Sequence, residues 1–190
     1  MPYRKFAFAQ GEYYHLYNRG NNFQNVFFER ENYLFFLKRL REYLIPEVID
    51  LIAYCLMPNH YHLLVHLNQE NLSDAMQGFS LSYSKAINKK YGRVGSLFQG
   101  RFKAIPIHKN EYLLHLSRYI HLNPVAANLV TRAEDWEFSS YPYYLGLRNG
   151  SLIAPDVVLS QFRDVNAYRE FVEDLQKYRD VLPQGLLFEE

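Results

Sequence analysis

The sequence contains very little cysteine and no long apolar run. Cys55 is the single cysteine among 190 residues, so an internal disulfide is excluded. This count fits a reducing compartment, and we expect a cytoplasmic protein. A transmembrane helix would need about 18 consecutive apolar residues, which the chain lacks. The N-terminus also lacks the apolar run of a secretory signal, so we expect a folded soluble protein without a membrane partner.

Acidic residues are absent from one long stretch. Residues 75–110 hold seven Lys or Arg and no Asp or Glu. More broadly, residues 1–130 hold 15 basic and 9 acidic residues, whereas residues 131–190 hold 6 and 11. A local positive field attracts a polyanion, although a solvated helix face followed by a loop would give the same composition. We favour anion binding, because the stretch carries no compensating acid at all.

Apolar spacing and turn residues predict the order strand, helix, strand, strand, helix, strand. The strands are expected at 12–19, 48–57, 60–67 and 101–107, and the helices at 29–44 and 72–91. Further helices are expected at 110–122, ended by Asn123 and Pro124, and at 167–178. The first six elements spell a ferredoxin-like βαββαβ arrangement of class α+β with an antiparallel sheet, to which a helix and a small C-terminal extension are added.

Histidines gather on one face of the strand expected at 60–67. Side chains alternate along a strand, so the apolar residues at odd positions would pack on the helices. His60, His62 and His66 then point the other way. Two imidazoles at positions i and i+2 are close enough to share one divalent metal ion. Incidental histidines on a polar face are the alternative, and the spacing does not choose the metal.

A tyrosine, an amide and an imidazole share one face of the helix expected at 110–122. His115, Tyr119 and Asn123 follow one another at intervals of four residues. A tyrosine can act as a covalent nucleophile, but its ordinary pKa of about 10 means that it needs activation. From spacing alone a structural tyrosine is the more frequent explanation, and Tyr83, Tyr91 and Tyr112 are equally eligible.

Four motifs in order resemble those of the HUH single-tyrosine transposases, in particular the group associated with repetitive extragenic palindromes (REP). The motifs are YHLYNRG at 14–20, MPNHYH at 57–62, GSLFQGRFK at 95–103 and YIHLNPV at 119–125. The segment WEFSSY at 136–141 is similar to that group as well. Four spaced motifs are far more specific than any one of them.

The resemblance implies a fold, a site and a substrate. It assigns the metal pair to His60 and His62, the nucleophile to Tyr119, and a third ligand to Asn123, where related transposases often have glutamine. It implies Mg²⁺ or Mn²⁺ as the cofactor and single-stranded DNA near a hairpin as the partner. Residues 1–130 would form the transposase domain, and 131–190 a partly helical C-terminal extension.

The resemblance also implies cleavage through a 5′-phosphotyrosine link, with strand joining by the reverse step. His15 and His115 are candidates for supporting the metal ligands, with DNA contact or core packing as alternatives for His15. The expected phosphate contacts are Arg19, Arg93, Arg101 and Lys103, and Gln99 is expected to read a base edge.

Three alternatives stay open. The first is a nucleic-acid-binding module of the same fold without chemistry, although such modules place aromatics where this strand has histidines. The second is a metal-dependent nuclease in which water is the nucleophile. The third is a relaxase or replication initiator of the HUH type, which the short chain and the Tyr119–Asn123 helix disfavour. The sequence also leaves open whether the protein acts as a homodimer.

Overall fold

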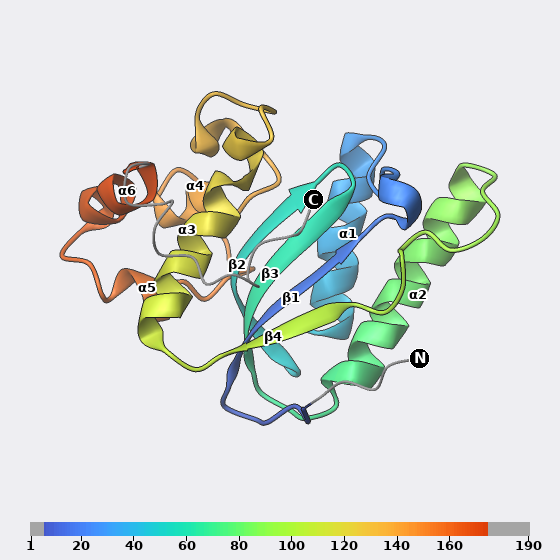
Figure 1. Ribbon diagram of the computed structural model, residues 1–190, viewed down its shortest axis with the longest axis horizontal. Helices are drawn as coiled ribbons and strands as arrows, with labels where there is room; N and C mark the ends of the chain where they lie inside the picture. Colours follow the sequence, from blue (N-terminus) through green and yellow to red (C-terminus); the bar gives the residue numbers. More distant parts are fainter. Residues whose placement is uncertain (1–5, 175–190) are drawn as a thin grey trace.

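The computed structural model describes residues 6–174, which form one antiparallel sheet with helices on both faces (Figure 1). The strands are β1 (Tyr13–Arg19), β2 (Ile49–Met57), β3 (His60–Leu67) and β4 (Lys103–Ile107). Their order in the sheet is β2-β3-β1-β4, with β3 and β1 in the centre. The predicted α+β, ferredoxin-like fold is confirmed, and each strand begins within two residues of its predicted start.

The strand register places the histidines at the start of β3 beside the end of β1. β2 and β3 form a hairpin whose turn is Pro58-Asn59, because Pro cannot continue a strand ladder. β1 pairs with β3 so that Arg19 lies opposite His60 and Tyr17 opposite His62. The end of β1 and the beginning of β3 therefore meet at one end of the sheet.

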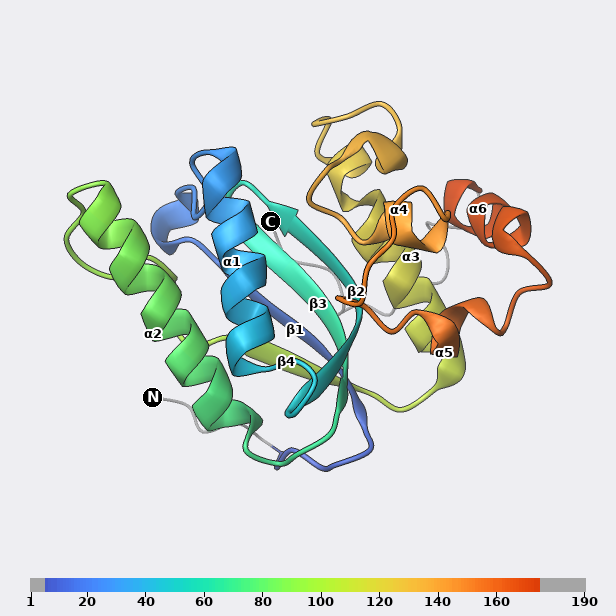
Figure 2. The ribbon, with the colours of Figure 1, turned by 180° about the vertical axis from the view of Figure 1, so that it is seen from behind.

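Two helices cover one face of the sheet, as Figure 2 shows. These are α1 (Arg30–Tyr43) and α2 (Leu72–Lys90), and Glu29 and Asn32 form a capping box at the start of α1. The odd-numbered residues of β3 are buried in this core together with Phe36 and Phe79. The alternation of β3 thus leaves its histidines on the opposite face.

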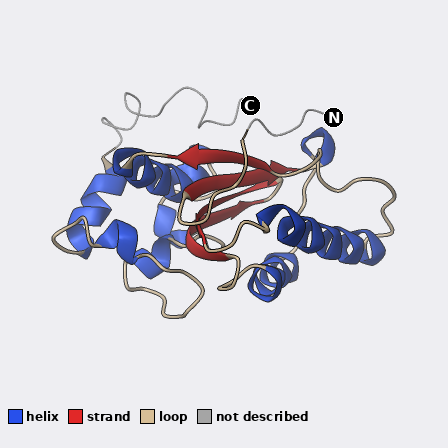
Figure 3. Ribbon diagram, turned by 90° about the horizontal axis from the view of Figure 1, so that it is seen from below, coloured by secondary structure: helices blue, strands red, loops and turns tan. Residues whose placement is uncertain are grey.

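The other face carries α3 (Asn110–Ala126) and the C-terminal elements (Figure 3). These elements are η2 (Ala133–Asp135), α4 (Tyr141–Tyr144), α5 (Asp156–Leu159) and α6 (Val165–Glu173). Leu64 of β3 packs there with Leu116 and Ile120 of α3, in a second core.

Helix α3 runs further than predicted. We expected it to end at Asn123 and Pro124, and this was wrong, because the helix continues to Ala126. A proline this close to the end of a helix removes only one intrahelical hydrogen bond. The last turn is still closed, since the backbone N–H of Ala127 donates to the carbonyl of Asn123 over 3.0 Å. Pro124 itself is buried.

The extension covers the outer edge of β2. The backbone N–H of Leu56 donates to the carbonyl of Phe138 (2.9 Å), and that of Ser140 donates to the carbonyl of Tyr54 (2.9 Å). These bonds satisfy backbone groups of an edge strand that would otherwise be open to pairing with another chain.

The helix predicted at 167–178 corresponds to α6, and residues 175–178 lie outside the described residues. The domain division after residue 130 stays a prediction.

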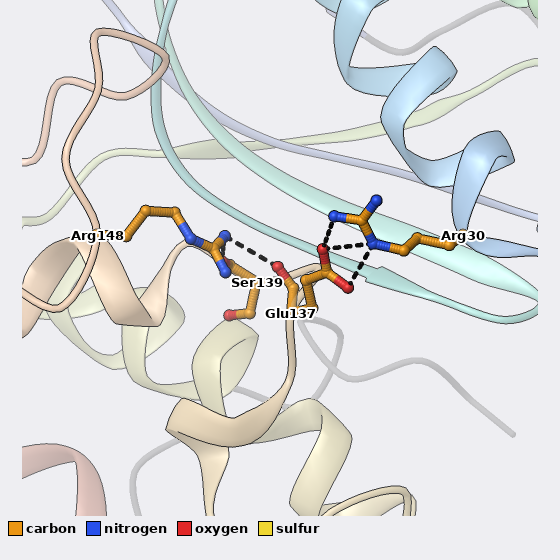
Figure 4. A network of polar contacts seen from close by, with 4 residues as sticks. All are labelled: Arg30, Glu137, Ser139 and Arg148. Atoms are coloured by element: carbon orange, nitrogen blue, oxygen red, sulfur yellow. Dashed lines mark hydrogen bonds and ion pairs between the residues drawn. The ribbon is translucent and has the colours of Figure 1, made fainter.

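An exposed ion pair also joins the two helical layers (Figure 4). Arg30 of α1 donates from Nε to both carboxylate oxygens of Glu137 (2.8 and 3.0 Å). Arg148 donates to the backbone carbonyl of Glu137 over 2.9 Å.

Within residues 6–174, no helix combines the length and apolar character needed to span a membrane.

Candidate active site

His60 and His62, two of the three histidines of β3, lie next to each other on the face toward α3. Their ring centroids are 5.0 Å apart. His62 is fully buried, whereas His60, at the start of the strand, is partly exposed. The interval of two residues accounts for this shared face, as the sequence predicted.

His15 of the neighbouring strand β1 contacts His62 directly. Nε2 of His15 lies 2.9 Å from Nδ1 of His62, so one ring donates a hydrogen bond and the other accepts it. Burial lowers the pKa of His15 to about 3. Burial, followed by the neighbouring His15 and His60, holds the pKa of His62 well below its ordinary value. Both imidazoles are therefore neutral at neutral pH, which is the form that binds metals.

His60 is held by two asparagines. Its Nδ1 donates to Oδ1 of Asn59 over 2.7 Å, and its Nε2 lies 3.2 Å from Oδ1 of Asn123. Burial lowers the pKa of His60 to about 4, with the Asn123 contact opposing the shift and Arg19 adding to it. A neutral imidazole has one N–H. With that proton on Nδ1, Nε2 and the Asn123 oxygen are two electron-pair donors directed at a common space.

Tyr119 of α3 lies over the histidine pair. Its ring centroid is 5.3 Å from that of His62 and 6.5 Å from that of His15, both in edge-on geometry. Its side chain is only 6% exposed. One turn of α3 separates Tyr119 from Asn123, which explains how one helix supplies both residues. His60 and His62 of β3 thus come together with Tyr119 and Asn123 of α3 within a single chain.

His115 is not brought into this cluster. Its ring lies 5.4 Å from that of Phe171 in α6, one helical turn away from Tyr119. Burial and then Arg118 lower the pKa of His115, against an opposing effect of Glu111. No contact described for residues 6–174 joins His115 to the histidine pair. The sharing of one helix face with Tyr119 was therefore insufficient to place it in the site.

The candidate metal ligands form a mixed set of two imidazole nitrogens and one amide oxygen. Within residues 6–174, no three His, Cys, Asp or Glu side chains gather in a way that could hold a metal ion. A cation here would rest on the imidazoles of His60 and His62 and the amide oxygen of Asn123. Imidazole suits many divalent metals, and carbonyl oxygens, water and phosphate suit Mg²⁺ and Mn²⁺.

Most of the predicted DNA contacts lie near the same end of the sheet. Nε of Arg19 donates to Oε1 of Gln99, and the ammonium of Lys103 lies 5.8 Å from the ring centroid of Tyr17. Arg93 donates to the side-chain oxygen of Gln24 over 2.9 Å. Arg101 is exposed on the approach to β4.

Sequence reasoning missed two residues that border the site. Asn59 orients the imidazole of His60, but the Pro58-Asn59 pair indicated only a turn. Tyr17 lies with its ring centroid 4.9 Å from that of His15 and 6.1 Å from that of His62. Its position two residues after His15 on the same strand was a usable signal.

Comparisons with known proteins agree with this arrangement. Residues 9–123 match the family described as Transposase IS200 like. A putative REP-associated tyrosine transposase of Haemophilus influenzae is 26% identical over 103 residues, in an alignment that covers 48% of this chain and 58% of that protein. This chain thus matches little more than half of that relative's length.

A solved structure shares the fold. It is a REP-associated tyrosine transposase bound to a REP hairpin, with a TM-score of 0.63 and 18% sequence identity. The alignment covers 81% of this chain and 94% of that structure. Because the family match spans more than half of the sequence, the chain belongs to the IS200-like transposases and, within the HUH single-tyrosine enzymes, resembles the REP-associated group.

Proposed function

We propose that the protein cleaves and rejoins single-stranded DNA near hairpins, with Tyr119 as the nucleophile and a divalent metal as cofactor. The observation that carries this proposal is the convergence of Tyr119 with the histidine pair, at 5.3 Å between the ring centroids of Tyr119 and His62. Membership of the IS200-like family supports it.

In this proposal His60, His62 and Asn123 hold Mg²⁺ or Mn²⁺. When bound, such a cation supplies Lewis-acid polarisation of the scissile phosphate oxygens. Asn59 fixes the orientation of the His60 ring through the 2.7 Å bond to Nδ1. His15 does the same for His62 from β1. Support of this kind keeps a ligand in its binding tautomer.

Tyr119 performs the covalent step. A bond forms between its phenolic oxygen and the phosphorus, and the bond from phosphorus to the 3′ oxygen breaks. The phenol gives up its proton, and the departing oxygen gains one and leaves as a 3′-hydroxyl. The resulting 5′-phosphotyrosine retains the phosphodiester energy. A different 3′-hydroxyl can therefore reverse the step and join new ends, without water.

The substrate assignment rests on charge as well as on family. Arg19, Arg93, Arg101 and Lys103 provide exposed or half-exposed cations for phosphates, and Gln99 can hydrogen-bond a base edge. The solved relative is described as bound to a REP hairpin. We extend that substrate, a hairpin flanked by single-stranded DNA, to this chain. We also keep a homodimer as part of the proposal, although one chain brings together all the proposed residues.

Two alternative functions predict different chemistry. A nuclease using water would cleave DNA without a covalent adduct. A module without chemistry would bind DNA across an open sheet, yet here α3 covers the histidine-bearing face and buries His62. The coverage of this face by α3 argues against a sheet surface on which bases stack.

The test is capture of the covalent intermediate. Hairpin-bearing single strands labelled at their 3′ end, which stays on the fragment joined to the tyrosine, are incubated with the protein and Mn²⁺ and then separated under denaturing conditions. We expect a labelled protein band for the unaltered chain, and none for Tyr119→Phe, which lacks the attacking oxygen. Tyr112→Phe, on the same helix, should behave like the unaltered chain. Cleavage without a labelled band would favour water as the nucleophile, and an adduct in Tyr119→Phe would exclude our assignment.

A further inference from the structure

An exposed phenylalanine occupies a backbone conformation that bulky residues rarely adopt. Phe23 ends the short helix η1 (Asn21–Phe23), with φ at 58°, and the preceding Asn22 has φ at 50°. Its side chain is 56% exposed. A left-handed backbone is unfavourable for a non-glycine residue, because its Cβ atom crowds the following carbonyl oxygen. Burial of the ring does not offset that cost, so the strain marks a candidate functional position.

The loop around Phe23 is rigidly fixed. The backbone N–H of Gly20 donates to the carbonyl of Asn59 (2.7 Å), and that of Asn21 donates to the carbonyl of Leu97 (2.9 Å). A Cβ atom at Gly20 would lie 1.9 Å from the carbonyl oxygen of Gln24, so only glycine fits there. The loop therefore holds Phe23 in place before any ligand arrives.

The Phe23 ring carries a cation on one face. The guanidinium carbon of Arg19 lies 4.1 Å from the ring centroid, and Nε of the same arginine donates to Gln99. Arginine planes and aromatic rings are the surfaces on which unpaired bases stack, and glutamine can hydrogen-bond a base edge. Phe23, Arg19 and Gln99, which we call the base platform, thus combine stacking, charge and hydrogen bonding.

One side chain joins the base platform to the proposed metal site. Nδ2 of Asn59 donates to the backbone carbonyl of Phe23 over 3.4 Å, while Oδ1 accepts from Nδ1 of His60 over 2.7 Å. Arg19 is also the partner of His60 in the register of β1 and β3. A nucleotide on the base platform would therefore lie next to the phosphate at His60.

We propose that the base platform binds one unpaired nucleobase of the single-stranded DNA that flanks the scissile phosphate. The base stacks on Phe23, Gln99 bonds its edge, and Arg19 contributes its charge. This inference rests on the proposed function and extends it, because it names the residues that position the strand. The Arg19 cation beside the ring favours a nucleic acid over an apolar protein surface.

The test measures binding rather than cleavage. Hairpin strands with single-stranded flanks are titrated against the Tyr119→Phe protein without divalent metal, with an abasic site moved through the flanks one position at a time. Phe23→Leu should weaken binding of the intact strand at least about fivefold, because leucine offers no ring for stacking. Phe23→Trp should retain binding. At one abasic position Phe23→Leu should make no further difference, because the stacking partner is already gone.

Phe28→Leu is the matched control. Phe28 is 39% exposed, and the guanidinium carbon of Arg93 lies 5.5 Å from its ring centroid. Its binding should match that of the Tyr119→Phe parent. Thermal unfolding establishes that every variant is folded. Tight binding by the parent with no effect of Phe23→Leu, or equal losses at every abasic position, would overturn the base platform alone. Failure of the parent to bind any flanked hairpin would overturn the proposed function as well.

Discussion

The contact between His15 and His62 constrains where the protons lie. His62 can offer Nε2 to a cation only when its own proton is on Nδ1, from which it donates to Nε2 of His15. His15 must then carry its proton on Nδ1, which is buried without a hydrogen-bond partner among residues 6–174. The unpartnered Nδ1–H of His15 is thus unfavourable for stability, but it keeps His62 in the tautomer that can bind a metal.

His15→Leu should therefore raise the metal concentration needed for cleavage about 10–100-fold. His15→Gln can still accept the hydrogen bond from His62 and should lie closer to the unaltered protein. The measurement is the Mn²⁺ concentration that gives half-maximal adduct formation. If leucine and histidine at position 15 required the same Mn²⁺ concentration, His15 would serve packing only.

At the level of elements, the extension is attached to α3 and β2 through one buried polar chain. Oγ of Ser140 accepts from the backbone N–H of Tyr54 (2.8 Å) and lies 2.8 Å from Nε2 of His121. Nδ1 of His121 shares a hydrogen bond of 2.9 Å with the hydroxyl of Tyr168. Burial lowers the pKa of His121 to about 3, so its ring is neutral at neutral pH. Three separate segments are thereby joined around one imidazole.

Ser140→Ala should lower the free energy of unfolding by about 1–3 kcal/mol, because it leaves buried donors without partners. The measurement is urea unfolding at neutral pH. Ser160→Ala, at an exposed serine just after α5, is the control and should change stability very little. Equal stabilities for the two variants would show that the chain through Ser140 contributes little.

The sequence was sufficient for most elements but insufficient for long-range contacts. Period-two alternation located β3 and the face of its histidines, since that pattern is local. The end of α3 was misplaced, because packing of Pro124 decided it and no local signal reports packing. His115 shares a helix face with Tyr119, yet its ring packs against Phe171 of α6. Asn59 and Phe23 gain their roles only from strand register, which a single sequence does not display.

At the scale of the whole molecule, three histidines are buried and a fourth, His60, is largely covered, and all four are held in their neutral form. The pKa values of His15 and His121 fall to about 3, that of His60 to about 4, and that of His62 is also strongly lowered, all chiefly by burial. In the unfolded chain a histidine titrates near 6.5. Between these values the unfolded state binds more protons than the folded state, so stability falls as the pH falls.

The free energy of unfolding should therefore decrease from pH 7 toward pH 4, with His60 alone contributing on the order of 3 kcal/mol to the loss. Urea unfolding at intervals of half a pH unit, with a chelator present, measures this. Lys90 and Arg30 lower the pKa values of Glu29 and Glu137, respectively. Protonation of these two carboxylates therefore reduces stability only below about pH 4.5. A stability that stayed constant down to pH 4.5 would contradict the burial of neutral histidines.

The packing of α3 between the sheet and the extension has a consequence for strand exchange. That helix lies between the sheet and the extension, with core contacts on both sides. A DNA end attached to Tyr119 would consequently be held on a helix that packs against the sheet on one side and the extension on the other. A new junction would then form only where a second strand reaches the end held on Tyr119. Which two ends are joined would depend on how the second strand is brought to the site.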